Sequence, residues 1–133
     1  MGIQIKATVR QVGSTTSEAT ARNHTCFVDR PEPKGGANRG PMGGELMLMG
    51  IGGCFMSNLL AAVTSRGLEI SDLSINVSAM LEDAPPRFSN IVLALNSAYP
   101  DKEVLKELVG IAEANCIAVN TVKGSAEISV ELA

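Results

Sequence analysis

The stretch that decides the fold is residues 45–65, ELMLMGIGGCFMSNLLAAVTS. It carries no charge after Glu45 and is apolar on every side of a helix. Such a helix is either the core helix of a soluble protein or a membrane span. Ser57 and Asn58 interrupt its apolar surface, and the glycines at 50, 52 and 53 lower its hydrophobicity. The rest of the chain is amphipathic. We therefore predict a buried core helix, with a membrane helix as the alternative.

Both flanks of this helix carry recognisable signals. Glu45 opens it, because a carboxylate is favoured at the positive end of the helix dipole. Arg66 and Gly67 end it with a cation and a residue that readily adopts the left-handed conformation. Residues 29–44, DRPEPKGGANRGPMGG, are rich in proline, glycine and charge, which predicts a long loop. Loops of this length inside a domain are usually functional or mobile.

The N-terminal part predicts a hairpin. Residues 3–12, IQIKATVRQV, alternate with a period of two, which is typical of a half-buried strand. The face that this strand would bury carries Ile3, Ile5, Ala7 and Val9. Gly13 and Ser14 supply a turn, and residues 18–28 supply the partner strand, with room for a break near Asn23.

The C-terminal half predicts two more strands, a helix and a closing strand. Residues 70–81 and 88–97 form an antiparallel pair, separated by EDAPPR, whose adjacent prolines cannot continue a ladder. Residues 101–119 have a helical apolar stripe, and Asp101 is a good N-cap. Residues 125–132 alternate as a strand. The whole order predicts an α+β fold with antiparallel strands and two long helices in one domain, residues 1–133.

The composition limits the classes of partner that the protein could bind. A 45% hydrophobic and 19% charged composition is typical of a folded globular chain. The net charge of −3 and an aromatic content of 3% remove both the basic field and the stacking platforms that nucleic acids need. The first ten residues show no continuous apolar run of a secretory signal, so we expect a cytoplasmic protein with no membrane or nucleic-acid partner.

The three cysteines, Cys26, Cys54 and Cys116, are the candidate reactive side chains. An odd number without a C-x-x-C pair argues against a disulfide scaffold or a structural zinc site. Cys54 and Cys116 lie on the two long helices, whose apolar stripes face one core. The two thiols could therefore come within disulfide reach, which needs Cα atoms within about 7 Å. The alternative is that both are buried filler residues.

Two segments together resemble a known signature. GELMLMGIGGCF at residues 44–55, followed by AEANC at residues 112–116, is similar to the two-cysteine signature of the OsmC/Ohr family, named after osmotically inducible protein C and the organic hydroperoxide resistance protein. The resemblance implies an OsmC-like, intertwined homodimer with the active site at its interface. It also implies a peroxidase that acts on organic hydroperoxides without a metal or bound cofactor, and is recycled by an external dithiol or lipoyl-type reductant.

The resemblance also implies roles for residues. Cys54 matches the peroxidatic cysteine, which attacks the peroxide and becomes a sulfenic acid. Cys116 matches the resolving cysteine, which condenses with that sulfenic acid to a disulfide. A thiolate forms at neutral pH only where a nearby cation or hydrogen-bond donor favours it.

In the family this help comes from an arginine held by a glutamate. Glu45 stands at the glutamate position, although it could equally serve only as the N-terminal charge of the helix. Relatives carry the arginine in the turn after the first strand, and residues 12–17, VGSTTS, contain none. We predict that Arg39 replaces it; the other candidates are Arg10, Arg22 and Arg30. A second departure is Ile117, where many relatives have proline.

The remaining candidates have plainer interpretations. His24, the only histidine, is expected at the surface, and Cys26 is expected in the core of a strand. The methionines at 42, 47, 49 and 56 would fill the core or a dimer interface, or line an apolar hydroperoxide pocket together with leucine, isoleucine and phenylalanine. The alternative function is a non-catalytic OsmC-like dimer that binds a small hydrophobic ligand, which the absence of arginine in the first turn favours.

Overall fold

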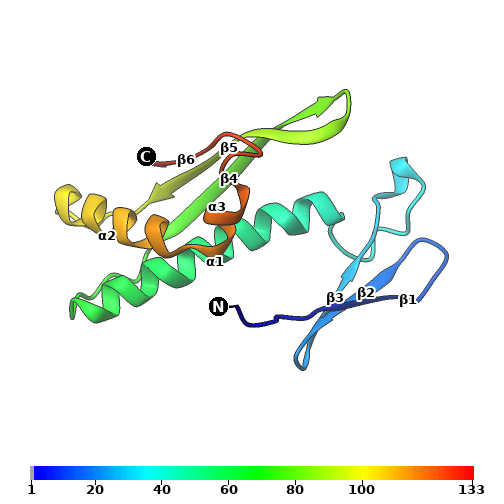
Figure 1. Ribbon diagram of the computed structural model, residues 1–133, viewed down its shortest axis with the longest axis horizontal. Helices are drawn as coiled ribbons and strands as arrows, with labels where there is room; N and C mark the ends of the chain where they lie inside the picture. The colour runs from blue at the N-terminus through cyan, green and yellow to red at the C-terminus, as the bar shows by residue number, and fades with distance from the viewer. Residues whose placement is uncertain (1) are drawn as a thin grey trace. The chain divides into compact units, whose positions relative to one another are not determined.

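The computed structural model describes residues 2–133 and has the predicted α+β class (Figure 1). In chain order the elements are β1 (Thr8–Gln11), β2 (Ser17–Ala21), β3 (His24–Val28), the 3-10 helix η1 (Glu32–Lys34), α1 (Gly43–Ser65), β4 (Ser74–Asp83), β5 (Pro86–Asn96), α2 (Lys102–Asn115), α3 (Ile117–Val122) and β6 (Ile128–Leu132). They belong to two units, Met1–Met47 and Leu48–Ala133. The single domain over residues 1–133 stays a prediction.

The first unit holds the antiparallel sheet β1-β2-β3. The break predicted near Asn23 is the β2–β3 turn, where Arg22 has a φ of 55°. The predicted strand over residues 3–12 is wrong in its first half, because pairing with β2 starts only at Thr8. Ile3 and Ile5 are 89% and 80% exposed. Alternation shows which face a strand would bury, but burial also needs a partner.

The second unit holds the sheet β4-β5-β6. The β4–β5 hairpin is tighter than predicted, since Asp83 pairs with Pro86 across a turn made of Ala84 and Pro85. Pro86 is tolerated because it is the first residue of its strand. β6 begins three residues later than predicted and pairs with β5 in parallel, which a helical crossover between the two strands allows.

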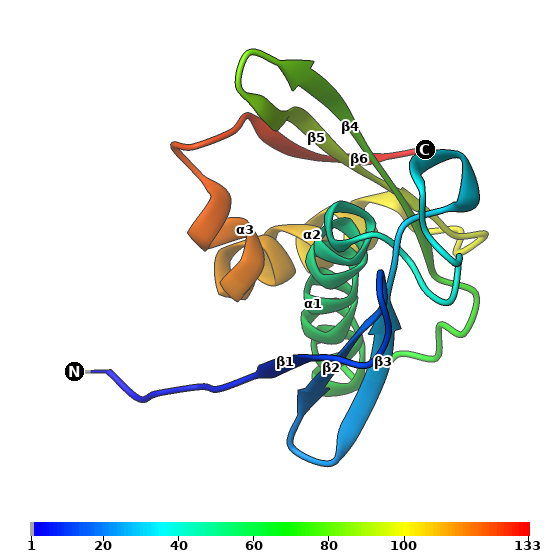
Figure 2. The same ribbon diagram turned by 90° about the vertical axis from the view of Figure 1, so that its right-hand side faces the viewer.

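The helices of this unit pack on one side of that sheet (Figure 2). Phe55 and Leu59 of α1, Leu93 of β5 and Leu108 of α2 are 0% exposed and form the centre of the core. Gly52 allows α1 to approach β4 closely, because a Cβ there would lie 2.8 Å from a methyl carbon of Val77. The predicted core helix is therefore confirmed along one stripe of α1.

The other faces of α1 are less covered. Its most apolar 18-residue window has a mean hydropathy of 1.8 and is 33% buried. By length and composition alone this helix could also cross a membrane, a test that core helices of soluble proteins pass too. Met47, Met49 and Leu60 are all more than two-fifths exposed.

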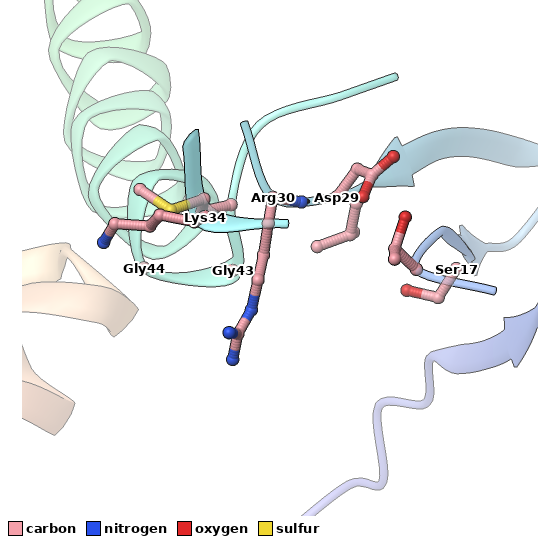
Figure 3. A pocket seen from close by; sticks show the side chains of 9 residues that line it. Ser17, Asp29, Arg30, Lys34, Gly43 and Gly44 are labelled. Carbon is pink, nitrogen blue, oxygen red and sulfur yellow. Dashed lines mark hydrogen bonds between the residues drawn. The ribbon is translucent and has the colours of Figure 1, made fainter. Parts of the chain in front are cut away.

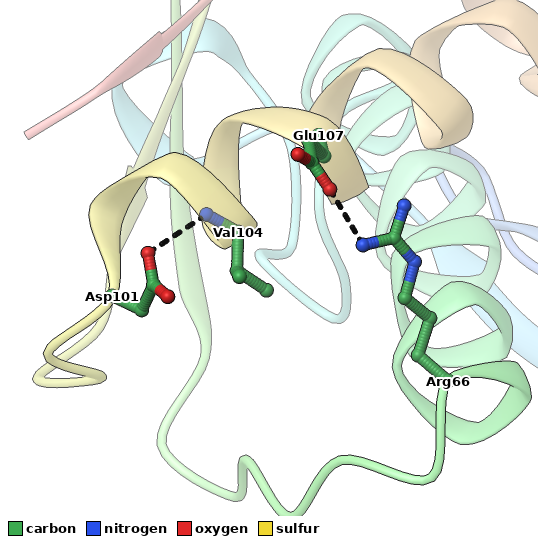
Figure 4. Close-up of polar contacts among 4 residues, drawn as sticks. All are labelled: Arg66, Asp101, Val104 and Glu107. Carbon is green, nitrogen blue, oxygen red and sulfur yellow. Dashed lines mark hydrogen bonds and ion pairs between the residues drawn. The ribbon is translucent and has the colours of Figure 1, made fainter.

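The helix ends follow the predicted capping chemistry. Gly67 adopts a φ of 64° after α1. The Asp101 carboxylate accepts a hydrogen bond from the backbone N–H of Val104 at 3.1 Å, so it is the N-cap of α2 (Figure 4). In the same region the guanidinium of Arg66 pairs with the Glu107 carboxylate at 2.6 Å and ties the end of α1 to α2 (Figure 4).

One predicted helix is in fact two. Residues 101–119 do not form a continuous helix, because α2 ends at Asn115 and α3 starts at Ile117. Cys116 lies between them in an extended conformation, with φ −81° and ψ 113°. The break occurs without proline or glycine, which is why the sequence pattern did not indicate it.

Candidate active site

The structure brings two of the predicted site residues together. Cys54 lies on α1 and is partly buried, and Cys116 lies at the α2–α3 break and is 0% exposed. Both thiols are free. The Cys54 side chain is close enough to act on the Cys116 thiol directly. The prediction that these thiols lie close together is thus confirmed, but the helical position predicted for Cys116 is wrong, because it lies in the break after α2. Their catalytic roles stay predictions.

The surroundings of the two sulfurs differ. Burial raises the pKa of the Cys116 thiol above its ordinary value, and the backbone N–H groups of Val119 and Ala118 oppose the rise. The neighbouring Cys54 side chain raises it further. Cys116 is therefore a protonated thiol at neutral pH, and a buried protonated thiol is a poor first nucleophile. Cys54 is the better placed of the two to meet a reactant.

A cavity of about 460 Å³ opens between α1 and α2, and neither Cys54 nor Cys116 is among its lining residues. Its lining residues come from α1, the turn after it and α2: Asn58, Ala61, Ala62, Ser65, Arg66, Ile111 and Asn115. Asn58 donates a hydrogen bond to the Cys54 carbonyl at 3.0 Å, and Asn115 directly precedes Cys116, so two of the lining residues are neighbours of the cysteines. Its apolar lining is Ala61, Ala62 and Ile111, whereas Phe55 and Leu59 face the core. The lining of leucine, methionine, isoleucine and phenylalanine expected around the thiols stays a prediction.

In the first unit, Asp29 organises the long loop that carries Arg39. Its carboxylate is 3% exposed and accepts hydrogen bonds from the Thr16 hydroxyl at 2.7 Å and from the backbone N–H groups of Arg30 and Arg39 at 2.7 and 3.2 Å. Burial acts to raise the pKa of Asp29, but these hydrogen bonds outweigh it and lower the pKa to about 2. The loop is thereby tied to the end of β3.

Replacing Asp29 with asparagine is expected to destabilise the protein in a pH-dependent way. The folded-state pKa of about 2 lies below the ordinary aspartate value, so the carboxylate stabilises the fold above about pH 4 and this contribution is lost as the pH falls toward 2. Melting curves should therefore separate most at neutral pH and converge near pH 2. Glu32→Gln, at an exposed residue of the same loop, should melt like the parent at every pH. A difference in melting temperature between Asp29→Asn and the parent that does not change with pH would contradict the carboxylate's role.

The predicted arginine has a defined place in this unit. The Arg39 guanidinium lies 4.3 Å from the centroid of the Phe27 ring, a cation–π contact. One of its nitrogens would be 3.8 Å from a Cβ on Gly13, so it reaches the turn after β1. Gly40 lets the loop pass the Phe27 carbonyl, where a Cβ would clash.

Glu45, Arg10 and Arg30 each lie in surroundings of their own. The Glu45 carboxylate accepts the Met42 backbone N–H at 2.9 Å, which fits its plain interpretation as a helix-start residue. No ion pair joins it to Arg39 in residues 2–133. Arg10 pairs with Glu18 at 2.9 Å. Arg30 lines a separate cavity of about 450 Å³ with Lys34, Ser17 and the first glycines of α1 (Figure 3).

Two residues outside the thiol pair were also assigned from the sequence. His24 is exposed, as predicted. The core position predicted for Cys26 is wrong, because its side chain is on the exposed side of β3. Alternation in a short hairpin does not say which face is covered.

Comparisons with known proteins agree with this architecture. The family model described as OsmC-like protein matches residues 35–131. A Psychrobacter arcticus structure described as an osmotic stress induced and detoxification response protein is 15% identical, with a TM-score of 0.84 over 100% of this chain and 98% of that one. No curated protein sequence matches the chain.

Two other similar structures carry more specific names. An organic hydroperoxide resistance protein OsmC from Legionella pneumophila is 17% identical, with a TM-score of 0.72 over 98% of this chain and 97% of that one. The organic hydroperoxide resistance protein OhrB of Bacillus subtilis is 23% identical, with a TM-score of 0.69 over 98% of both chains. At these identities the structures establish the fold, and the family match over most of the sequence shows that this chain belongs to the OsmC-like proteins.

Proposed function

We propose that this chain is a thiol-dependent peroxidase that reduces organic hydroperoxides. The observation that carries the proposal is the pairing of a partly exposed Cys54 with a buried, protonated Cys116. Two filler cysteines would not need this contact. The names of the Legionella pneumophila and Bacillus subtilis relatives support the same class of substrate.

The proposed reaction needs only the two thiols, the hydroperoxide and an external reductant. The Cys54 thiolate attacks the terminal oxygen of the hydroperoxide, which breaks the O–O bond, leaves Cys54 as a sulfenic acid and releases an alkoxide that takes up a proton as the alcohol. The Cys116 thiol then forms an S–S bond with Cys54 and water leaves. An external dithiol or lipoyl-type reductant restores both thiols and is itself oxidised to a disulfide.

The cavity supports an organic substrate over hydrogen peroxide. Its volume of about 460 Å³ falls in the range of ordinary small-molecule sites. Ala61, Ala62 and Ile111 offer apolar surface to an alkyl group, and Asn58 offers an amide. Hydrogen peroxide is too small to use these contacts, so only a larger hydroperoxide gains binding energy from them.

Arg39 is the residue we propose to favour the Cys54 thiolate. Residues 12–17 lack the arginine that relatives carry in the turn after the first strand, but the Arg39 guanidinium reaches this turn from the loop. Phe27 and the Asp29 network hold Arg39 at both its side chain and its backbone. Glu45 is proposed to act with it by fixing the start of α1.

We also propose that the protein acts as an intertwined homodimer. α1 is apolar on all sides, yet only one stripe is buried, and Met49 and Leu60 remain 59% and 45% exposed. Ile111 and Ile117 near Cys116 are 42% and 69% exposed. Large apolar side chains left exposed on several helices favour an interface, and a second copy would cover them.

Mass spectrometry after one equivalent of an organic hydroperoxide tests both proposals. The reduced protein should lose two hydrogen atoms and yield a peptide pair crosslinked between Cys54 and Cys116. Cumene hydroperoxide is a suitable substrate, and equimolar hydrogen peroxide is the comparison, which should react more slowly. Native spectra of the same sample should show twice the chain mass of 13.9 kDa. A protein that stays fully reduced would refute the peroxidase, and a monomer would refute the dimer.

A further inference from the structure

The break that carries Cys116 is held by contacts and not by a helix-breaking residue. Residues 115–118 are NCIA and contain neither proline nor glycine. In a continuous helix, the backbone N–H of Ala118 would donate to the carbonyl of Ala114, four residues earlier. The extended conformation of Cys116 removes this bond, so the Ala114 carbonyl needs another donor.

Asn120 supplies that donor. Its side-chain Nδ2 donates to the Ala114 carbonyl at 3.1 Å, across the break. Its backbone N–H donates to the Cys116 carbonyl at 3.0 Å. Asn120 therefore joins the last turn of α2 to the start of α3 through the carbonyls of Ala114 and of Cys116 itself.

The orientation of Cys116 depends on this arrangement. The Cys116 and Val119 side chains are 0% and 1% exposed, whereas Ile117 between them is 69% exposed. If α2 continued through residue 116, the following residues would change direction, and the sulfur would move with them. A disulfide tolerates little error, because its Cα atoms must lie within about 7 Å with a narrow dihedral range.

We infer that Asn120 is a positioning residue, which holds the Cys116 thiol against Cys54 for disulfide formation. Its consequence for turnover rests on the proposed function. Once Cys54 is a sulfenic acid, two reactions compete for it. Attack by the Cys116 sulfur gives the disulfide and water, whereas a second hydroperoxide oxidises the sulfenic acid to a sulfinic acid and is itself reduced to the alcohol. The position of Cys116 sets the balance between them.

Two variants test this role. Asn120→Asp keeps the shape but loses the donor, and Asn120→Ala loses the side chain. Asn120 is exposed, so both substitutions leave the core untouched. In single-turnover experiments with cumene hydroperoxide, both should form the sulfenic acid at the parent rate. Its conversion to the disulfide should slow by roughly fivefold, the effect of losing one hydrogen bond, and the sulfinic acid fraction should rise.

Thr121→Val is the matched control. The Thr121 hydroxyl donates to the Ile117 carbonyl at 2.7 Å, so it is also an exposed side chain bonded to a carbonyl, but the bond lies wholly within α3. In this variant, the sulfenic acid should divide between disulfide and sulfinic acid in the same proportion as in the parent. A merely structural role of Asn120 would lower the melting temperature without changing the partition.

A second readout does not need peroxide. In the reduced protein, an alkylating reagent should modify the buried Cys116 faster in both Asn120 variants than in the parent or in Thr121→Val. Faster alkylation in a protein that never forms the disulfide would support the positioning role and refute the proposed function. Parent-like alkylation and partition in both Asn120 variants would overturn the inference while leaving the peroxidase intact.

Discussion

Cys54→Ser is expected to abolish dithiol-driven reduction of cumene hydroperoxide. A serine hydroxyl does not ionise near neutral pH and does not form a stable product equivalent to a sulfenic acid, so the first step has no substitute. The rate should fall by at least about a thousandfold, to the uncatalysed background. The measurement is consumption of hydroperoxide with dithiothreitol as the reductant.

Cys116→Ser should separate the two steps. Cys54 should still react once, because it is the partly exposed thiol, but the sulfenic acid would have no partner and would accumulate or over-oxidise. Cys26→Ser is the matched control, since Cys26 is an exposed cysteine on β3 and should leave turnover unchanged. Parent-like turnover by Cys54→Ser would end the peroxidase proposal and leave the alternative of a non-catalytic dimer that binds a small hydrophobic ligand.

Much of the fold could be predicted because it depends on local chemistry. The apolar run of α1, the N-cap Asp101 and the left-handed Gly67 each require only neighbours in sequence. The approach of Cys54 to Cys116 could also be predicted, because α1 and α2 bury their apolar stripes in one core, and Cys116 directly follows α2. These expectations needed no knowledge of long-range pairing.

The features that were missed depend on contacts between distant residues. Nothing in the sequence around Cys116 indicates a break, because the amide that compensates for it comes from Asn120. The Asp29 network joins residues up to thirteen positions apart, and an aspartate at the end of a strand before a proline was its only local signal. Asn58 served only as an argument against a membrane span, although it contacts the Cys54 carbonyl and lines the cavity.

Phe55→Ala is expected to cause the largest loss of stability among single core truncations next to the site. Phe55 is 0% exposed and lies in the core cluster with Leu59, Leu93 and Leu108. Removing a fully buried phenylalanine ring typically costs about 3–5 kcal/mol. That is a large share of the roughly 5–15 kcal/mol by which such domains are stable. The melting temperature should therefore fall by roughly 10 to 20 °C.

The control is Ser57→Ala, two residues further along α1 at an exposed position. It should change the free energy of unfolding by no more than about 0.5 kcal/mol. Thermal melts at one fixed protein concentration compare the two, since a homodimer's melting temperature depends on concentration. A Phe55→Ala shift as small as that of Ser57→Ala would mean that Phe55 is not in the core. Phe55 directly follows Cys54, so its burial sets how α1 is rotated about its axis. Without that burial, nothing would explain why α1 turns the Cys54 thiol toward Cys116.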